Sequence, residues 1–370
     1  MSVTKKTCAL LAMALTMAAC SKGDPKPDPE PAEPTTAVDP ATAPILDDAT
    51  RASIDAFMKA HVNDDAFVPI YLGERGVAVD GQDAVRFDLT TGGFADEDRD
   101  VGPNSLSIAS LVPSLDAASK ARPKTAEDLE RYVVLAPNIY VEPSVTFGTF
   151  TEVLYTTGQR LIPTSVEGSS RITIGGGQPL KIATRRGDSW GGFNAVTPRL
   201  EVGPPDLEEL DGAPLELMLF IEPAGVRVAG EGALLPPIAG CPADGPTVCN
   251  EGGADASDLM GEVRASSGAE RDGALSELVA LYDLSALYAA VLKIKVRYPD
   301  ETVVTVAASP GVPFAVVSAV LDAVRWKRAG GGPSGSFADD AAFEAAAPST
   351  RPFSYPADAL FADPIFAIAR

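Results

Sequence analysis

The sequence predicts an α+β fold in which two small sheets follow one another along the chain, each with helices packed on one face. The main basis for this prediction is one pattern of short strands and amphipathic helices that occurs twice. The chain has 370 residues, a length that suits about two domains. Hydrophobic residues make up 45% of it, enough for a folded core in each domain.

The clearest part of the repeat is a pair of amphipathic helices. Residues 145–154 align with residues 312–321 at a constant offset of 167. Phe147 and Phe150 begin an apolar stripe with intervals of three and four residues, and Phe314 begins the matching stripe. We therefore interpret the two helices as copies of one element, in preference to a chance similarity.

The other elements of the repeat occur in the same order in both copies. Each copy has a strand that closes on a glycine turn, a helix, a β-branched strand before the aligned helix, and a closing strand. These are expected at residues 76–81, 111–120, 132–136 and 171–174 in the first copy, and at residues 225–230, 284–296, 302–307 and 365–369 in the second.

Composition places the boundaries of the two copies. The first copy is expected at residues 45–186 and the second at residues 214–370. Residues 187–213 are rich in Gly, Pro and Glu, and we interpret them as a linker.

An additional helix is expected at residues 47–61, before the first strand of the first copy. Asp47 or Asp48 would cap its first turn. Its apolar stripe includes Phe57 and ends at His61, so we interpret this histidine as a structural residue.

The first nineteen residues predict a signal peptide. Lys5 and Lys6 precede an apolar run at residues 8–19. As a helix this run would span only about 18 Å, well short of a bilayer core of about 30 Å. It ends in small residues before Cys20, as in a bacterial lipobox, which predicts that Cys20 is lipidated and begins the mature protein. The alternative is an ordinary signal peptide with Cys20 as an incidental thiol.

Residues 20–44 predict a tether between the lipid and the folded body. Seven of the 24 residues from 21 to 44 are proline, and few of the others could enter a core. Such a segment favours an extended polyproline-like conformation. We expect a protein held by lipid at the cell envelope, with its body in the periplasm or at the cell surface.

Two cysteines in the body fit an oxidising compartment. Cys241 and Cys249 flank a turn-rich stretch, and the simplest interpretation is a local disulfide. The alternative is a pair of metal-binding or redox thiols.

Charge and composition limit the chemistry of the chain. The formal net charge of −21 disfavours binding to nucleic acid, because the chain would repel a phosphate backbone. His61 is the only histidine, so a site with several histidine ligands is excluded. The sequence nominates no catalytic, cofactor-binding or metal-binding residue.

Residues 187–192 resemble the GDSGG motif of chymotrypsin-like proteases. Trp190, however, interrupts the turn that an oxyanion hole requires, and His61, the only available base, lies on a predicted helix. We therefore do not nominate Ser189 as a nucleophile.

Two further motifs are interpreted as turns. Aspartates alternate in residues 96–100 as at the start of a calcium loop, but Ser107 stands where a bidentate glutamate is needed. Residues 175–177 are three glycines without a P-loop lysine, and they predict a hairpin turn.

The second copy also carries a family pattern. Residues 298–325 contain a strand, a short turn and a helix that opens with Val312–Phe314 and continues into Val320–Asp322. This arrangement resembles the periplasmic domain of the ExbD/TolR biopolymer-transport family, whose helix opens with V-P-[FY] and continues into V-[ML]-D. Residues 145–159 resemble the same pattern more weakly.

The chain also departs from that family. Its members have an N-terminal membrane helix with an acidic residue used in proton coupling, and here a lipid anchor and a tether replace it. The acidic residue that commonly follows the family's strand is missing as well, with Ala308 and Ser309 in one copy and Pro137 and Asn138 in the other.

The resemblance implies a non-enzymatic envelope lipoprotein. In the family the soluble part self-associates and contacts envelope partners or peptidoglycan, so we expect the two copies to pair as an internal pseudo-dimer. Expected partners are the membrane, through the lipid, and TolQ/ExbB-like proteins or peptidoglycan. The alternative is a solute-binding or hydrolytic lipoprotein with a site between the two copies.

Overall fold

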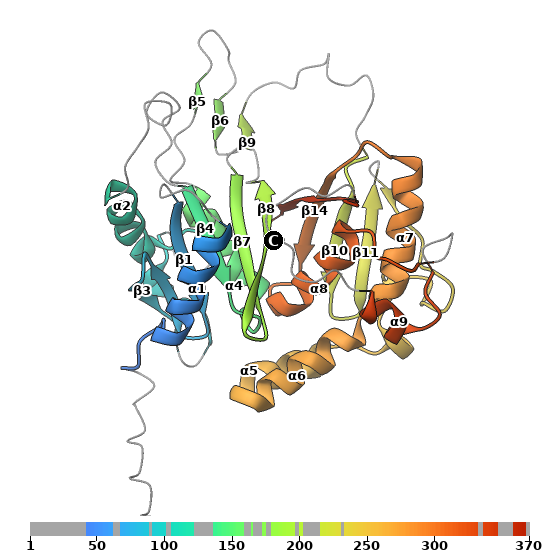
Figure 1. The fold of residues 1–370 in the computed structure, drawn as a ribbon, viewed down its shortest axis with the longest axis horizontal. Helices are drawn as coiled ribbons and strands as arrows, with labels where there is room; N and C mark the ends of the chain where they lie inside the picture. Colours follow the sequence, from blue (N-terminus) through green and yellow to red (C-terminus); the bar gives the residue numbers. More distant parts are fainter. Residues whose placement is uncertain are drawn as a thin grey trace, which may run out of the picture. The chain divides into compact units, whose positions relative to one another are not determined.

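The computed structural model describes most of the body (Figure 1). From Pro44 onward its elements belong to one compact unit, Pro44–Arg370. The expected signal peptide, Cys20 and all of the tether before residue 42 lie outside the described residues. The described residues are 42–61, 67–88, 91–100, 105–121, 136–158, 164–165, 172–174, 179–196, 200–202, 215–230, 233–331, 336–346 and 358–367.

The first copy forms a mixed sheet with strand order β3-β2-β1-β4-β7-β8. Strands β1, β4 and β7 are parallel neighbours, and the hairpins β1–β2, β2–β3 and β7–β8 are antiparallel. The strands are β1 (Phe67–Gly73), β2 (Gly76–Val79), β3 (Gln82–Arg86), β4 (Ala136–Val141), β7 (Pro179–Arg186) and β8 (Ser189–Val196).

The second copy forms a similar sheet with strand order β15-β14-β10-β11-β12, in which β13 also pairs with β11. Strands β10, β14 and β15 are parallel neighbours. The predicted α+β fold with two tandem sheets is therefore confirmed. The strands are β10 (Met218–Glu222), β11 (Gly225–Gly230), β12 (Ala233–Leu234), β13 (Val248–Cys249), β14 (Val303–Ala308) and β15 (Asp363–Phe366).

The two sheets have the same strand register. In the first copy, Leu72 of β1 lies opposite Val141 of β4. In the second, Ile221 of β10 lies opposite Ala308 of β14. The residue pairs nearest the turns of the β1–β2 and β10–β11 hairpins, Gly73–Gly76 and Glu222–Gly225, also correspond. The repeat in the sequence is therefore a duplication of backbone structure.

The two sheets meet edge to edge at β8. Ile365 of β15 pairs in parallel with Val196 of β8, so the described strands can be followed as one 12-stranded sheet. β8 lies within residues 187–213, for which the composition predicts a linker, and it pairs with β7 along its whole length. This segment therefore joins the copies through strand pairing as well as through the chain. In the same range, β9 (Leu200–Val202) pairs with β6 (Ile172–Ile174), which also pairs with β5 (Thr164–Ser165).

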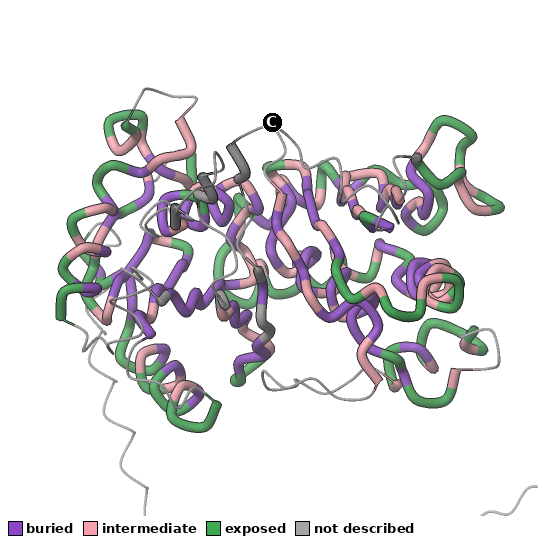
Figure 2. Tube along the Cα trace, turned by 90° about the horizontal axis from the view of Figure 1, so that it is seen from above, coloured by how far each residue is buried: buried purple, intermediate pink, exposed green. Residues whose placement is uncertain are grey.

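Helices from both copies bury their apolar faces in one main core on one side of the sheets. Figure 2 shows these buried segments in purple. Helices α5 and α6 belong to a part of the second copy for which the repeat predicts no element. The helices of this core are α2 (Val112–Ala121), α4 (Phe147–Gly158), α5 (Ser257–Ala265), α6 (Gly268–Leu281), α7 (Leu284–Arg297), α8 (Phe314–Arg325) and α9 (Asp340–Ala345).

Helix α1 (Asp48–His61) packs in a second, smaller core. The backbone N–H of Thr50 donates to the Asp47 carboxylate at 2.7 Å, so Asp47 is the cap. Ile54 and Phe57 are buried as predicted, whereas His61 is exposed, with its ring centroid 4.7 Å from that of Phe57. The sheet residues under α1 are Tyr71, Ala78, Tyr140, Ala183 and Trp190, which alternate along their strands with residues of the main core. The first sheet therefore carries helices on both faces, where we had predicted one.

Three strand positions differ from the prediction. The strand expected at residues 132–136 is β4, Ala136–Val141, and residues 132–135 lie outside the described part. The strand near residues 171–174 is β6 of the small sheet, whereas β7 closes the first copy beside β4. The strand expected at residues 365–369 is β15, which begins earlier, at Asp363.

Among the described helices, none is by itself both long enough and apolar enough to cross a membrane. Helices α6 and α7 taken together reach that length and composition, with a bend of 46° at the break between them.

Candidate functional site: the junction between the two copies

Reciprocal hydrogen bonds join the two copies at the start of helices α4 and α8. The N–H of Phe147 donates to the carbonyl of Val312 at 2.8 Å, and the N–H of Phe314 donates to the carbonyl of Val145 at 2.7 Å. Residues 147 and 314, like 145 and 312, are equivalent positions of the repeat. The two copies thus face each other with pseudo-twofold symmetry.

A second pair of bonds repeats this symmetry one residue further along each helix. The N–H of Gly148 donates to the carbonyl of Pro310, and the N–H of Ala315 donates to that of Pro143, both at 2.9 Å. These four N–H groups belong to first helical turns, which have no acceptor within their own helix. Each copy therefore caps the helix of the other.

Aromatic rings fill the space beneath the paired helix starts. The ring centroids of Phe150 and Phe314 are 4.7 Å apart, and Phe366 of β15 lies 5.0 Å from Phe150. Phe147, Phe150, Phe314 and Phe366 are all essentially inaccessible to solvent. Since they come from both copies, their burial stabilises the pairing as well as each copy.

Charged side chains also link the two copies. Arg186 of β7 donates to the Ser318 hydroxyl of α8 at 2.8 Å and forms an ion pair with Asp322. Asp322 is the aspartate of the family-like V-L-D pattern. Arg271 of α6 forms an ion pair with Glu74, which lies in the β1–β2 turn.

A pocket of about 450 Å³ opens beside the junction and is lined by both copies. The first copy contributes the hydroxyls of Ser144, Thr146 and Thr149 near the start of α4. The second contributes Arg264 of α5 and Arg271 of α6. Glu74, the ion-pair partner of Arg271, lines the pocket as well, so the lining would suit a small polar molecule.

A buried charged cluster lies just before Ser144, under helix α1. The Tyr71 hydroxyl donates to Glu142 at 3.0 Å, and Arg185 forms an ion pair with the same carboxylate oxygen at 3.2 Å. Burial raises the pKa of Glu142, and the nearby Arg185 guanidinium and the Tyr71 hydrogen bond oppose that rise. Arg185 also donates to the Thr50 hydroxyl of α1, so the cluster ties α1 to the sheet.

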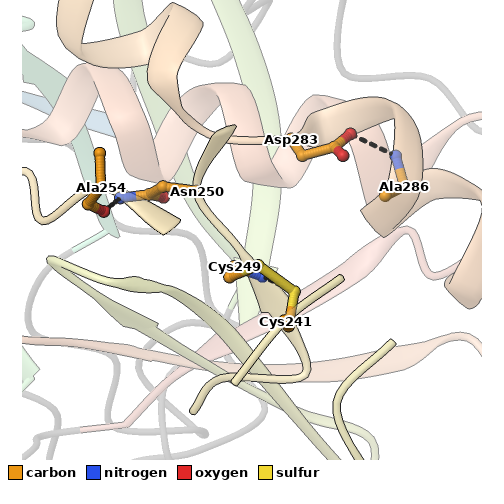
Figure 3. Close-up of a disulfide and its surroundings, with 6 residues drawn as sticks. All are labelled: Cys241, Cys249, Asn250, Ala254, Asp283 and Ala286. Carbon is orange, nitrogen blue, oxygen red and sulfur yellow. Dashed lines mark hydrogen bonds between the residues drawn. A yellow bond between two sulfur atoms is a disulfide. The ribbon is translucent and has the colours of Figure 1, made fainter. Parts of the chain in front are cut away.

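The structure joins Cys241 and Cys249 in a disulfide, with their Cα atoms 5.5 Å apart (Figure 3). Cys249 lies in β13, which pairs with the start of β11. In the first copy, the end of β3 pairs with the start of β2 in the same way. The disulfide therefore closes a loop that the second copy has at the edge of its sheet. Asn250, the next residue, donates to the carbonyls of Pro223 and Ala254 and fixes the chain before α5.

The structure places the other singled-out residues in structural settings. Ser189 is the first residue of β8, and its hydroxyl donates to the carbonyl of Arg186 at 3.1 Å. Residues 96–98 form a short 3-10 helix, and the neighbouring Arg99 binds Glu152 of α4 at 2.8 Å. Residues 175–177 lie outside the described part of the chain.

Sequence reasoning did not identify the residues of the pocket. Ser144, Thr146 and Thr149 frame the start of a helix that was predicted, but nothing in their spacing indicates a cavity. Arg264 and Arg271 lie on helices that have no counterpart among the described residues of the first copy. The only available signal was this extra segment between β13 and α7, a region where the duplicated pattern is interrupted.

No protein-family model matches the chain, and no curated protein sequence matches it either.

Proposed function

We propose that the protein is a non-enzymatic lipoprotein of the bacterial cell envelope whose duplicated body binds an envelope partner. In this proposal Cys20 carries the lipid and residues 20–44 hold the body away from the membrane. The family resemblance suggests a TolQ/ExbB-like protein or peptidoglycan as the partner.

The reciprocal capping of α4 and α8 is the observation that carries this proposal. The resembled family uses its soluble part as a self-associating module, and in this chain the two copies pair through equivalent backbone groups. The disulfide between Cys241 and Cys249 is an additional support, because such bonds persist mainly in oxidising compartments.

Cross-linking in intact envelopes tests the proposal. The full chain, with tether and lipid anchor, is cross-linked and purified, and a Cys20→Ser chain serves as the control. We expect a defined envelope protein or peptidoglycan fragments with the full chain and a strong reduction with the control. Equal capture by both chains, or no capture by either, would count against the proposal.

The pocket at the junction favours a second candidate function, which is binding of a small solute. If the body retains a small polar molecule through purification, and Arg264→Ala releases it, this alternative gains the advantage. Native mass spectrometry of the two chains would show the difference in mass.

A further inference from the structure

One side of the sheet is covered in the first copy and has no described helix over it in the second. Trp190 of β8 belongs to the small core under α1. Phe366 of β15 belongs to the main core on the other side of the sheet. Successive residues of a strand lie on opposite sides, so Ile365 of β15, which pairs with β8, lies on the α1 side.

The shared register identifies which residues of the second copy correspond to the seat of α1. In the first copy, the paired residues Tyr71 and Tyr140 lie under α1. Their equivalents are Phe220 and Ala307, which also pair with each other. The neighbouring row of the second copy consists of Met218, Thr305 and Ile365.

These residues form an apolar surface that belongs to neither core. We define the open face as Met218, Phe220, Val303, Thr305 and Ile365. The first, second, fourth and fifth are half-buried, and Val303 is 36% exposed. None of its four apolar members packs against either hydrophobic core of the described residues. Leu219, Val304 and Val306, which alternate with them on β10 and β14, are fully buried in the main core. Ala307, on the same side as the open face, is 2% exposed and belongs to neither core.

The occupied seat in the first copy shows what such a surface binds. Helix α1 covers it with Ile54 and Phe57, which lie three residues apart and form one apolar edge of the helix. The ring of Phe57 meets that of Tyr140 edge to face, with centroids 6.2 Å apart. The open face continues this interface across the β8–β15 seam of the same sheet.

We propose that the open face is the docking site for an amphipathic helix of a partner protein, seated on the second copy as α1 is seated on the first. The partner helix would present an apolar edge with intervals of three and four residues, including an aromatic ring beside Phe220. This inference rests on the proposed function, since it names the surface and the kind of partner through which the body acts.

A peptide with the sequence of residues 45–61 is the probe, because it contains α1 and its capping residue. The labelled peptide is titrated with the complete mature chain carrying Cys20→Ser, and binding is followed by fluorescence anisotropy. We expect saturable binding that Phe220→Glu and Thr305→Lys each weaken about tenfold or more, since both place a charge on an apolar contact.

Two matched controls accompany the titration. Leu234→Glu changes an apolar residue of β12 that is 61% exposed and lies outside the open face, and it should leave the affinity unchanged. A peptide with Phe57→Asp should not bind, because it lacks the aromatic contact.

Four outcomes would overturn the proposal. They are absence of binding, binding that persists in Phe220→Glu and Thr305→Lys, dimerisation of the chain that Phe220→Glu abolishes, and a loss of thermal stability in both variants like that of a core substitution. The second would place the peptide on the first copy, the third would assign the face to another copy of the chain, and the fourth would show that the chain covers it. The titration needs no lipid and no envelope partner, so its failure leaves the proposed function to the cross-linking test.

Discussion

Glu142 shows how a single buried carboxylate couples the helix α1 to the sheet. It accepts from Tyr71 and pairs with Arg185, which in turn reaches Thr50 of α1. Because burial raises its pKa, the folded state holds its proton more tightly than the unfolded state does. Its ionisation therefore lowers stability as the pH rises from the ordinary glutamate range through the raised pKa in the fold.

Replacing Arg185 with methionine should increase the loss of stability that ionised Glu142 causes. The substitution removes the nearby positive charge, so the pKa of Glu142 rises further and the buried carboxylate has lost its ion-pair partner. We expect a loss of about 2 kcal/mol at pH 7, since Arg185 is partly exposed, and a clearly smaller loss at pH 4, where Glu142 is protonated. Urea unfolding at the two pH values measures the difference.

Arg227→Met is a suitable control for that experiment. It breaks the ion pair between Arg227 and Glu222, whose two side chains are each about a third exposed. The free energy of unfolding should therefore fall by roughly 0.5 kcal/mol. A loss for Arg185→Met that is equal at both pH values would contradict the proposed role of Glu142.

Two glycines at equivalent positions start the second strand of each hairpin. Gly76 and Gly225 have φ angles of 145° and 140°, and a Cβ at either one would collide with the carbonyl of Val85 or Val248 on the neighbouring strand. We expect Gly76→Ala and Gly225→Ala each to cost about 2–3 kcal/mol in chemical unfolding. Gly187→Ala has only the unfavourable φ of 56° and open space around it, so about 1 kcal/mol is expected. Equal losses at all three sites would argue against the close strand approach.

Among the elements, the repeated helices were predictable and some strands were not. Helices α4 and α8 begin at Phe147 and Phe314, where the apolar stripes and the offset of 167 placed them. The same offset applied to β14 would have placed β4 at its observed residues. The β-branched residues before β4 predict the strand a few residues too early, since strand preference is a weaker guide than the register of a repeat.

Pairing between distant segments explains the elements that were missed. Strand β8 contains two glycines and follows a turn, so its residues resemble a loop, yet β7 and β15 fix it in the sheet. Likewise, the sequence shows that α1 is amphipathic but not which face of a sheet it covers. At the candidate site, the disulfide pair could be proposed from spacing alone, whereas the pocket depends on how two copies meet.

The disulfide loop is a local addition to the second copy, and its removal should have a local effect. Closing a loop between residues eight apart in the sequence contributes about 2.5 kcal/mol in the chain-entropy description. We expect the double variant Cys241→Ser/Cys249→Ser to lose about this much in urea unfolding, with faster amide exchange confined to β11 and β13. The unaltered chain under reducing conditions should lose the same amount, and a larger loss in the variant than on reduction would contradict this account.

In the molecule as a whole, two copies of one fold use the contacts by which a symmetric dimer would form. Equivalent residues cap each other's helices, and phenylalanines of both copies share one cluster. A chain that satisfies these groups internally has no need of a second chain to do so. In the proposed function, the outer surfaces, above all the open face of the second copy, are the ones that bind partners.

Light scattering on the mature Cys20→Ser chain, separated by size over a range of concentrations, tests this internal pairing most directly. We predict the mass of one chain at every concentration, because each helix start finds its acceptor within the same chain. A stable dimer in which each chain supplies one copy to the other would contradict the pairing, and with it the proposal that the body presents its open surfaces to partners.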